Sequence, residues 1–481
     1  MNLIRIAVKG LAWTSVATVI RSIVALLQVS ILTRFLEKED FGVVAIATLF
    51  IGFTQLFLDL GVSVGIMHRH DISPHQYSSL FFINILSGFL LTTFLCILAP
   101  FISSLYREPS LTPILCFLSL TVLFASLGSQ HRTVQQKKMR FKYISLIDIF
   151  SSFLTLLIAV ILAYNDFGVY SLVFSTLFYS AFSNFLYLSL GLYLDRNISF
   201  HFNFKEIHYF IKIGFFSIGS QIIDYFSREL DILIMSIIFS KDIIGMYSLC
   251  KKLVMSAYGA INPILLKVLT PMLSSIHEDV NRVRRIYYEI VETVSIVSIP
   301  IYSIMAIFSS CIIYNLYGEQ YMGSAPVLSL LAILYALSSI NNPITSLQTA
   351  YGRADLGFYW TIVRIGMTAI FLFVGSFWGI YGLLLAQIIG FFIVYPAFWH
   401  ITIKPLIGGK LQDLLLLSAK PILMNLILSI PIIFYFYKST NILACMFICF
   451  LYIVVLIIIE ISLQKDSYIV SCLLKYSKSR N

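Results

Sequence analysis

Runs of about twenty or more mostly apolar residues follow one another along almost the whole chain. A helix of that length spans the roughly 30 Å hydrocarbon core of a bilayer. Lipid offers no partners to backbone N–H and C=O groups, so a spanning segment must satisfy them within a helix or a closed barrel. Runs this long favour helices, and the sequence therefore predicts an all-α integral membrane protein.

Composition excludes the soluble classes. Hydrophobic residues make up 59% of the 481 residues and charged residues 12%, with a mean hydropathy of +0.90, whereas about 25% of a soluble domain is charged. The net charge of +10 does not indicate a nucleic-acid partner, because the positive residues concentrate in short loops. The cysteines form no CxxC pair, and the loop histidines His68, His70 and His75 are expected to be solvated, so no metal site is predicted.

We predict about fourteen transmembrane helices. Their approximate limits are 10–36, 41–66, 77–105, 111–134, 143–164, 167–194, 207–239, 243–272, 286–317, 324–350, 356–377, 379–402, 413–437 and 440–463. The connecting loops are short, and none contains the GxxxxGK[ST] pattern of a phosphate-binding loop. The chain is therefore predicted not to be an enzyme and to have no catalytic residues, with its activity carried inside the bundle.

Lysine and arginine are distributed unevenly between alternate loops. One set of loops holds most of them, including the clusters in 132–142 and 282–285 and the C-terminal residues 465–480. The other set holds only Lys38, Arg107, Lys241 and Lys438. Loops rich in Lys and Arg stay in the cytoplasm, so both termini are predicted to be cytoplasmic and the number of spans to be even.

The two halves of the chain repeat each other. At an offset of 203 residues, Lys38 aligns with Lys241 and Gly42 with Gly245; further on, at an offset of 213, Arg140 aligns with Arg353. An even number of spans per unit makes the repeats parallel. We predict two six-helix lobes around a central cavity, at 1–205 and 206–410, followed by two additional spans at 411–463 and a cytoplasmic tail at 464–481.

Charges occur inside two of the apolar runs of the second half. Asp224, Arg228 and Asp231 are spaced i, i+4, i+7, which places them on one helix face, and Glu229 lies on the neighbouring face. The next run carries Lys251 and Lys252. A charge exposed to lipid at mid-bilayer costs at least ~2.5–3.5 kcal/mol, so these side chains are expected to face protein or a watery cavity.

The repeat extends this polar set to the first half. Arg21 aligns with Asp224, which suggests an ion pair between the two lobes, and Asp59 aligns with Asn262; Arg364 is a further cation within a span. Two interpretations remain open and are compatible: structural ion pairs that hold helices together, and a hydrophilic path that contacts a ligand or a coupling ion. Near span ends, Asp148, Lys212, Lys420 and Glu460 are expected to extend their charged groups toward the interface.

Short motifs carry a family resemblance. They are Asp59-Leu60-Gly61-Val62, Arg69 with Ile72-Ser73, Gln136-Lys137 with Phe141, Asn262-Pro263-Ile264, Val268-Leu269-Thr270-Pro271 and Asn342-Pro343-Ile344. With these motifs the chain resembles the Wzx-type polysaccharide flippases, and among them the branch of colanic acid exporters, in the multidrug/oligosaccharidyl-lipid/polysaccharide exporter superfamily. The likeness runs from about residue 1 to 410.

The resemblance implies a function. It implies an exporter of the bacterial inner membrane that moves an undecaprenyl-diphosphate-linked oligosaccharide from the inner to the outer leaflet by alternating access. The product would serve capsule, exopolysaccharide or O-antigen assembly, with a polysaccharide polymerase and chain-length proteins as partners besides membrane lipids. It also implies that H+ or Na+ serves as coupling ion in at least some members.

The residues suit such a cargo. A lipid-linked diphosphate needs a polar, cationic cavity, and an aromatic ring can stack on a sugar. The predicted cavity residues are Arg21, Asp59, Tyr225, Arg228, Lys251, Lys252 and Arg364. The predicted coupling carboxylates are Asp224, Asp231 and Glu229, because one charge crossing 100 mV provides ~2.3 kcal/mol.

Other functions remain open. A cation-coupled drug antiporter and a lipid II flippase belong to the same superfamily, and the cationic candidates argue mildly against a cationic drug as cargo. A membrane-bound glycan polymerase or glycosyltransferase would need a sizeable external loop or a carboxylate motif facing a nucleotide sugar, and the sequence has neither.

Overall fold

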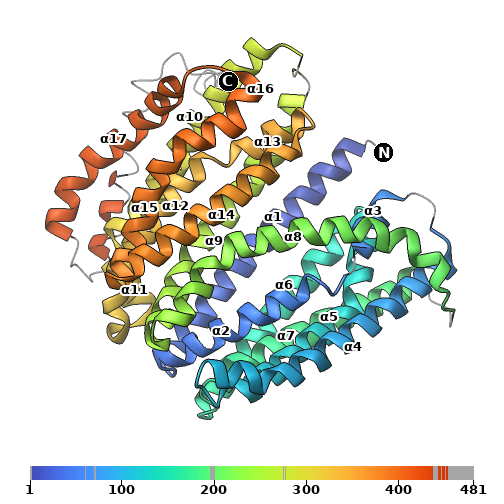
Figure 1. Ribbon diagram of the computed structural model, residues 1–481. Helices are drawn as coiled ribbons and strands as arrows, with labels where there is room; N and C mark the ends of the chain where they lie inside the picture. The colour runs from blue at the N-terminus through green and yellow to red at the C-terminus, as the bar shows by residue number, and fades with distance from the viewer. Residues whose placement is uncertain are drawn as a thin grey trace, which may run out of the picture. The chain divides into compact units, whose positions relative to one another are not determined.

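The computed structural model describes residues 3–59, 61–69, 72–195, 201–274, 276, 278–436, 443–445, 447–449 and 451–452. Within these helices, the longest stretches whose side chains are left out are 3–9, 211–217 and 260–268. The chain divides into two compact units, residues 1–248 and 249–481, which are described separately below (Figure 1). The predicted lobe boundaries at 205 and 410 stay predictions.

The first unit is built from helices. They are α1 (Leu3–Leu32), α2 (Lys38–Gln55), α3 (Val62–His68), α4 (Pro74–Leu105), α5 (Leu111–Lys137), α6 (Phe141–Tyr164), α7 (Tyr170–Asp195), α8 (Phe204–Ile238) and the start of α9 (Lys241–Ser274). Helix α5 is central: it packs along α4 on one side and α7 on the other, while α1 packs along α6. The three helices α4, α5 and α7 lie side by side in Figure 1.

The second unit continues with helices. They are α10 (Val280–Ile307), α11 (Ser309–Tyr317), the 3₁₀ turn η1 (Glu319–Ser324), α12 (Ala325–Ile340), α13 (Pro343–Ala350), α14 (Ala354–Ser376), α15 (Gly379–Phe398), the π-helical turn η2 (Trp399–Ile403), α16 (Lys404–Ile407) and α17 (Leu411–Phe436). Helix α10 packs on α12 and α17, and α14 packs on α15.

The helices follow the predicted apolar runs closely. Every regular element in the described part of the chain is helical, and ten of the helical segments found there are long and apolar enough to cross a membrane. The last predicted span, 440–463, and the tail 464–481 lie almost entirely outside the described residues. The fold is therefore an all-helical membrane protein, while the count of fourteen spans stays a prediction.

Three predicted spans are interrupted. The run 286–317 is divided at Phe308, between α10 and α11. The run 41–66 is not one helix: α2 ends at Gln55 and α3 begins at Val62, with Gly61 in the left-handed region at φ 75°. The run 324–350 is split between α12 and α13, where Pro343 opens the new helix because its fixed φ suits a first turn but its ring would break a continuing helix. An average of hydropathy along the chain does not reveal such breaks, because the residues on both sides of them are apolar.

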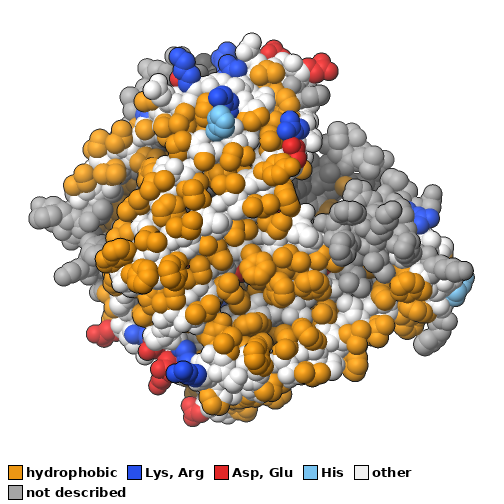
Figure 2. Space-filling model, viewed as in Figure 1, with side chains coloured by type: hydrophobic (Ala, Val, Ile, Leu, Met, Phe, Trp, Pro, Cys, Tyr) orange, Lys and Arg blue, Asp and Glu red, His pale blue; other side chains and the backbone are white. Residues whose placement is uncertain are grey.

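The surface of the helices matches a lipid environment. Figure 2 shows a continuous face of hydrophobic side chains over α14 and α15, with charged side chains at the helix ends. Exposed hydrophobic residues of these two helices include Phe373 and Phe377 of α14 and Phe392 of α15. At the beginning of α14, Arg353 pairs with Asp355 at 2.8 Å. A bilayer requires helices that are apolar along their middle part and carry their charged residues at the ends.

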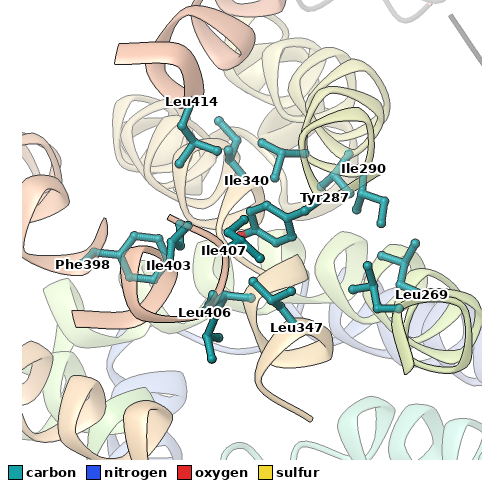
Figure 3. Close-up of a cluster of buried hydrophobic side chains, with 14 of the residues drawn as sticks. Leu269, Tyr287, Ile290, Ile340, Leu347, Phe398, Ile403, Leu406, Ile407 and Leu414 are labelled. Atoms are coloured by element: carbon teal, nitrogen blue, oxygen red, sulfur yellow. The ribbon is translucent and has the colours of Figure 1, made fainter. Parts of the chain in front are cut away.

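A buried cluster organises the second unit. Figure 3 shows Tyr287 and Ile290 of α10 meeting Leu347 of α13 and Ile407 of α16. Tyr287 is 1% exposed, and Leu347 and Ile407 are fully buried. Arg284 closes this end by donating from Nε to the carbonyl oxygen of Ile407 at 2.6 Å. The cluster thus holds α10 against the segment that runs from the end of α15 through η2 to α16.

Two glycines allow α2 and α9 to cross at very short range. A Cβ at Gly42 would lie 2.1 Å from the carbonyl oxygen of Lys241, and a Cβ at Gly245 would lie 2.0 Å from that of Lys38. No other residue fits, because an atom at that distance overlaps the backbone. The contact is reciprocal between residues that align in the predicted repeat.

Candidate functional site

A charged cluster lies inside the first unit, where α1, α5, α6 and α7 meet. Asp148 of α6 accepts on Oδ2 from Arg21 Nη1 of α1 at 3.1 Å and from Arg132 Nη2 of α5 at 3.3 Å. Its other oxygen, Oδ1, accepts from the hydroxyl of Tyr187 of α7 at 2.7 Å. One carboxylate therefore orders groups from three other helices.

Aromatic rings flank both guanidinium groups. Arg21 Cζ lies 5.9 Å from the ring centroid of Tyr179, and Arg132 Cζ lies 5.6 Å from that of Tyr187. Cation–π contacts of this kind contribute about 0.5–1 kcal/mol at exposed positions. The rings also hold the planar guanidinium groups in defined orientations.

Close helix packing positions the cluster. Gly128 of α5 and Gly191 of α7 each face a side chain of the opposite helix, Asn184 and His131, at distances that leave no room for a Cβ. Helix α1 is tied to α7 by Gln28, whose Nε2 donates to Ser175 Oγ at 3.2 Å. The backbone frame around the cluster is therefore tight, although its polar ends are accessible.

The charges of the cluster do not balance. Asp148 is 8% exposed, while the side chains of Arg21 and Arg132 are 41% and 43% exposed. Two guanidinium groups share one carboxylate, and the buried Nε of Arg132 has no hydrogen-bond partner among the described residues. The excess positive charge and the free donors can bind an anion, because guanidinium forks match the oxygens of a phosphate.

The structure relocates the ion pair predicted for Arg21. Its partner is Asp148 of α6, not Asp224. Asp148 itself does not reach toward the interface, as was expected from its place near a span end, but is buried and bonded on both oxygens. The reason is its position two turns into α6, where lipid-facing exposure would leave a carboxylate without partners.

Four further predicted charges of the first unit lie on α8. Asp224 and Arg228 are exposed, and Glu229 and Asp231 are half-buried. Asp231 accepts a hydrogen bond from the hydroxyl of Tyr247 of α9. The four side chains share one stretch of helix as predicted, and their roles as cavity or coupling residues stay predictions.

Tyr225 packs between helices. It is 9% exposed, its hydroxyl donates to the carbonyl oxygen of Leu49 of α2 at 2.5 Å, and its ring lies 6.2 Å from that of Phe53. We expect Tyr225→Phe to lower the free energy of unfolding by about 1 kcal/mol through loss of this hydrogen bond, and to leave transport at matched expression unchanged. Thermal unfolding of the purified variant measures the first effect. A transport defect without loss of stability would instead give the Tyr225 hydroxyl a role in transport.

Three predicted cations lie in the second unit. Lys251 is 4% exposed, whereas Lys252 and Arg364 are exposed. Lys251 and Arg364 both have interactions with neighbouring groups. That these three residues face a common cavity stays a prediction.

Asp59 lies in the interruption between α2 and α3. Its Oδ2 accepts from the backbone N–H of Ser63 and its Oδ1 from Ser63 Oγ, both at 2.9 Å. Ser63 Oγ also lies 2.8 Å from Thr133 Oγ1 of α5. The predicted cavity residue Asp59 thus begins helix α3 and joins it to α5.

Three residues of the cluster were not predicted from the sequence. Arg132 was counted with the basic loop, although it lies inside α5, and Tyr179 and Tyr187 give no signal among the many aromatic residues. Asp148 could have been found, because it is the only acidic residue between Phe141 and Tyr164.

Comparisons with known proteins place the chain in a family. Residues 31–326 match the family described as "Polysaccharide biosynthesis protein". The lipopolysaccharide biosynthesis protein WzxC of Escherichia coli is 25% identical over 89% of this chain and 87% of its own length. The teichuronic acid biosynthesis protein TuaB of Bacillus subtilis is 27% identical over 73% of each.

Solved structures share the fold. The lipid II flippase MurJ in an inward closed conformation superposes with a TM-score of 0.75 at 15% identity, covering 93% of this chain and 99% of that one. An inward-facing multidrug transporter of the MATE family gives a TM-score of 0.62 at 15% identity, covering 79% and 95%. These likenesses concern the fold alone. With more than half of its length matched by the family, the chain belongs to the polysaccharide biosynthesis protein family of membrane proteins.

Proposed function

We propose that this protein is a flippase that moves an undecaprenyl-diphosphate-linked oligosaccharide across the bacterial inner membrane by alternating access. The observation that carries the proposal is the cluster of Arg21, Arg132 and Asp148 in a chain of this family. Two partly exposed guanidinium groups that share one carboxylate suit a diphosphate, which would replace Asp148 as their anionic partner.

The cargo's anionic group distinguishes this proposal from drug export. A cationic drug would meet net positive charge at the cluster and be repelled, whereas a diphosphate gains charge-assisted hydrogen bonds. The relatives named for lipopolysaccharide and teichuronic acid biosynthesis support a surface polysaccharide precursor over lipid II. Coupling to H+ or Na+, a polymerase and chain-length proteins as partners, and cytoplasmic termini belong to the same proposal.

Complementation of a bacterium that lacks its own polysaccharide flippase tests this function. We expect wild-type protein to restore surface polysaccharide, and Arg21→Ala and Arg132→Ala at matched expression each to reduce it at least tenfold. Arg107→Ala is the matched control, because Arg107 lies in the turn between α4 and α5 with no ion pair among the described residues. Restoration by both cluster variants would leave the cluster a purely structural role.

Two further assays separate the alternative functions. Rescue of a strain depleted of its lipid II flippase, without rescue of surface polysaccharide, would make lipid II the cargo. Resistance to cationic drugs in an efflux-deficient strain, abolished by dissipating the ion gradient, would overturn the proposal in favour of an antiporter.

A further inference from the structure

A second charged cluster lies in the first unit, where α5 ends, α6 begins and α7 ends. Asp195, the last residue of α7, accepts on Oδ1 from Arg140 Nη1 at 3.3 Å and from Lys138 Nζ. Its Oδ2 accepts from Gln135 Nε2 of α5 at 2.6 Å, and Gln135 Oε1 accepts from Arg140 Nη1 at 3.3 Å. We call these four residues the outer cluster. One carboxylate and one amide hold its two cations.

The outer cluster has the same charge composition as the inner cluster, which is made of Arg21, Arg132, Asp148 and Tyr187. In each cluster two partly exposed cations share one buried carboxylate. The side chains of Lys138 and Arg140 are 39% and 36% exposed and that of Asp195 is 6% exposed, against 41%, 43% and 8% in the inner cluster. At about 1.5 Å per residue, the outer cluster lies roughly 9–12 Å further along α5, α6 and α7. The unit thus carries two such clusters, one above the other.

A tight turn directs both cations of the outer cluster to one carboxylate. The N–H of Arg140 bonds to the carbonyl oxygen of Gln135 at 2.9 Å, as in a Schellman ending of a helix. Met139 takes the left-handed conformation at φ 54°, where glycine is usual. Strain of this kind at a residue other than glycine persists only where the surrounding contacts fix it. The turn therefore reverses the chain between Lys138 and Arg140, and both side chains reach the same oxygen.

The outer cluster lies near the predicted level of the lipid head groups. Lys142, in the first turn of α6, has its Nζ 5.9 Å from the ring centroid of Trp13. Trp13 is exposed, and tryptophan is enriched where a membrane meets water. The loop 132–142 belongs to the set that is rich in Lys and Arg and is predicted to be cytoplasmic. A phosphate carried by a lipid of the inner leaflet would therefore meet the outer cluster before the inner cluster.

Membrane orientation alone does not explain the outer cluster. Orientation depends on how many Lys and Arg residues the loops hold, and it requires no fixed geometry for them. Here the fully buried Gln135 and the carboxylate of Asp195 hold two of them in place. Among the described residues, Lys138 donates one hydrogen bond and Arg140 bonds only through Nη1, which leaves donors on both. Ordered cations with remaining donors match the oxygens of a phosphate.

We propose that the outer cluster is a second binding site for the diphosphate of the cargo lipid, where the cargo is held before it reaches the inner cluster. Lys138 and Arg140 donate to the phosphate oxygens, while Asp195 and Gln135 orient the two cations. The role as an entry site rests on the proposed function; binding of a lipid-borne diphosphate does not.

The predicted repeat supplies a matched control. Arg353 of the second unit aligns with Arg140, but its partner is Asp355, at 2.8 Å. The two side chains are 49% and 46% exposed, so this arginine has no buried carboxylate as its partner. Arg353→Gln therefore removes the same charge from the corresponding turn without touching a cluster of this kind.

Native mass spectrometry of the purified full chain with undecaprenyl diphosphate tests the site, because it counts bound lipids and gives their Kd. We expect wild type to bind one lipid at each cluster. Lys138→Gln and Arg140→Gln are each expected to raise the Kd of one of these lipids about tenfold, the loss expected for one charge-assisted hydrogen bond. Each variant leaves Asp195 one cationic partner, which preserves the fold. Arg353→Gln is expected to bind both lipids as wild type does.

Two results would overturn the proposal. One is that both outer-cluster variants bind the lipid with the Kd values of Arg353→Gln. The other is that phosphatidylglycerol at equal concentration displaces undecaprenyl diphosphate from the outer cluster, because the site would then belong to a phospholipid head group.

Transport assays keep the two proposals apart. Binding at the outer cluster by a protein that fails to complement would leave the site standing and remove the flippase function. Complementation by a protein whose outer-cluster variants bind as wild type would do the reverse.

Transport in reconstituted vesicles tests the entry role. The outer-cluster variants are expected to need more cargo for half-maximal transport while the maximal rate is kept, whereas Arg132→Ala lowers the maximal rate. A lower maximal rate at an unchanged half-saturating concentration in Lys138→Gln and Arg140→Gln would mean that the outer cluster acts after the cargo has bound, and would overturn the entry role.

Discussion

Asp148→Ala is expected to abolish restoration of surface polysaccharide and to destabilise the protein by roughly 2–4 kcal/mol. Removing one partner of a fully buried ion pair costs about 3–5 kcal/mol because the other charge stays buried and unpaired. The cost here is lower because Arg21 and Arg132 are 41% and 43% exposed. Tyr187 also loses the acceptor of its hydroxyl. Thermal unfolding of the purified variant and complementation at matched expression measure the two effects.

Two variants sharpen this test. Asp148→Asn keeps an acceptor for Tyr187 but removes the charge, and is expected to retain more stability than Asp148→Ala while losing transport. Asp166→Asn, in the turn between α6 and α7, is the control and should behave as wild type, because asparagine tolerates the φ of 58° at this position as aspartate does. Full transport by Asp148→Asn would show that the negative charge of Asp148 is dispensable for transport.

Gly42→Ala and Gly245→Ala are each expected to reduce folded protein in the membrane severely. The new methyl would lie 2.1 or 2.0 Å from a backbone carbonyl oxygen, and a backbone atom cannot rotate away as a flexible side chain can. Overpacking in a core typically costs about 1–3 kcal/mol, and we expect the upper part of that range or more. The measurement is the yield of monodisperse protein on size-exclusion chromatography, followed by thermal unfolding.

Gly219→Ala in α8 is the matched control. A Cβ at Gly219 meets nothing within 4 Å, and alanine is favoured over glycine within a helix by about 1 kcal/mol. This substitution should therefore be neutral or stabilising. If Gly42→Ala and Gly245→Ala were as stable as the control, the close crossing of α2 and α9 would be wrong.

The sequence predicts those features that depend on hydropathy averaged over a long segment. Apolar length placed the helices within a few residues, as for 143–164 against Phe141–Tyr164. The break between Gln55 and Val62 was not predicted, because a glycine and an aspartate within an apolar run do not lower hydropathy enough to mark it. The structure places Arg21 within a charged group with Asp148, while its predicted role in a cavity stays a prediction. Its partner could not be identified, because a contact between residues 127 positions apart leaves no periodic pattern.

The structure gives physical roles to motifs that the sequence presented only as a resemblance. Asp59 and Gly61 end one helix and begin the next: the glycine takes a φ of 75°, and the carboxylate accepts from the N–H of Ser63. Lys137 bonds the other end of α3, donating from Nζ to the carbonyl oxygens of Ile66, at 2.7 Å, and Arg69. Both motifs thus tie the short helix α3 to α5.

The crossing of α2 and α9 has an evolutionary consequence. Gly42 approaches Lys241, and Gly245 approaches Lys38, which are corresponding positions of the predicted repeat. A six-span ancestor that dimerised about a two-fold axis would make one such contact and its symmetry mate. Duplication and fusion of such an ancestor would make the two glycines separate codons that share one constraint. Substitutions at either position should therefore be rare in descendants, and those that occur should be accompanied by change in the facing turn.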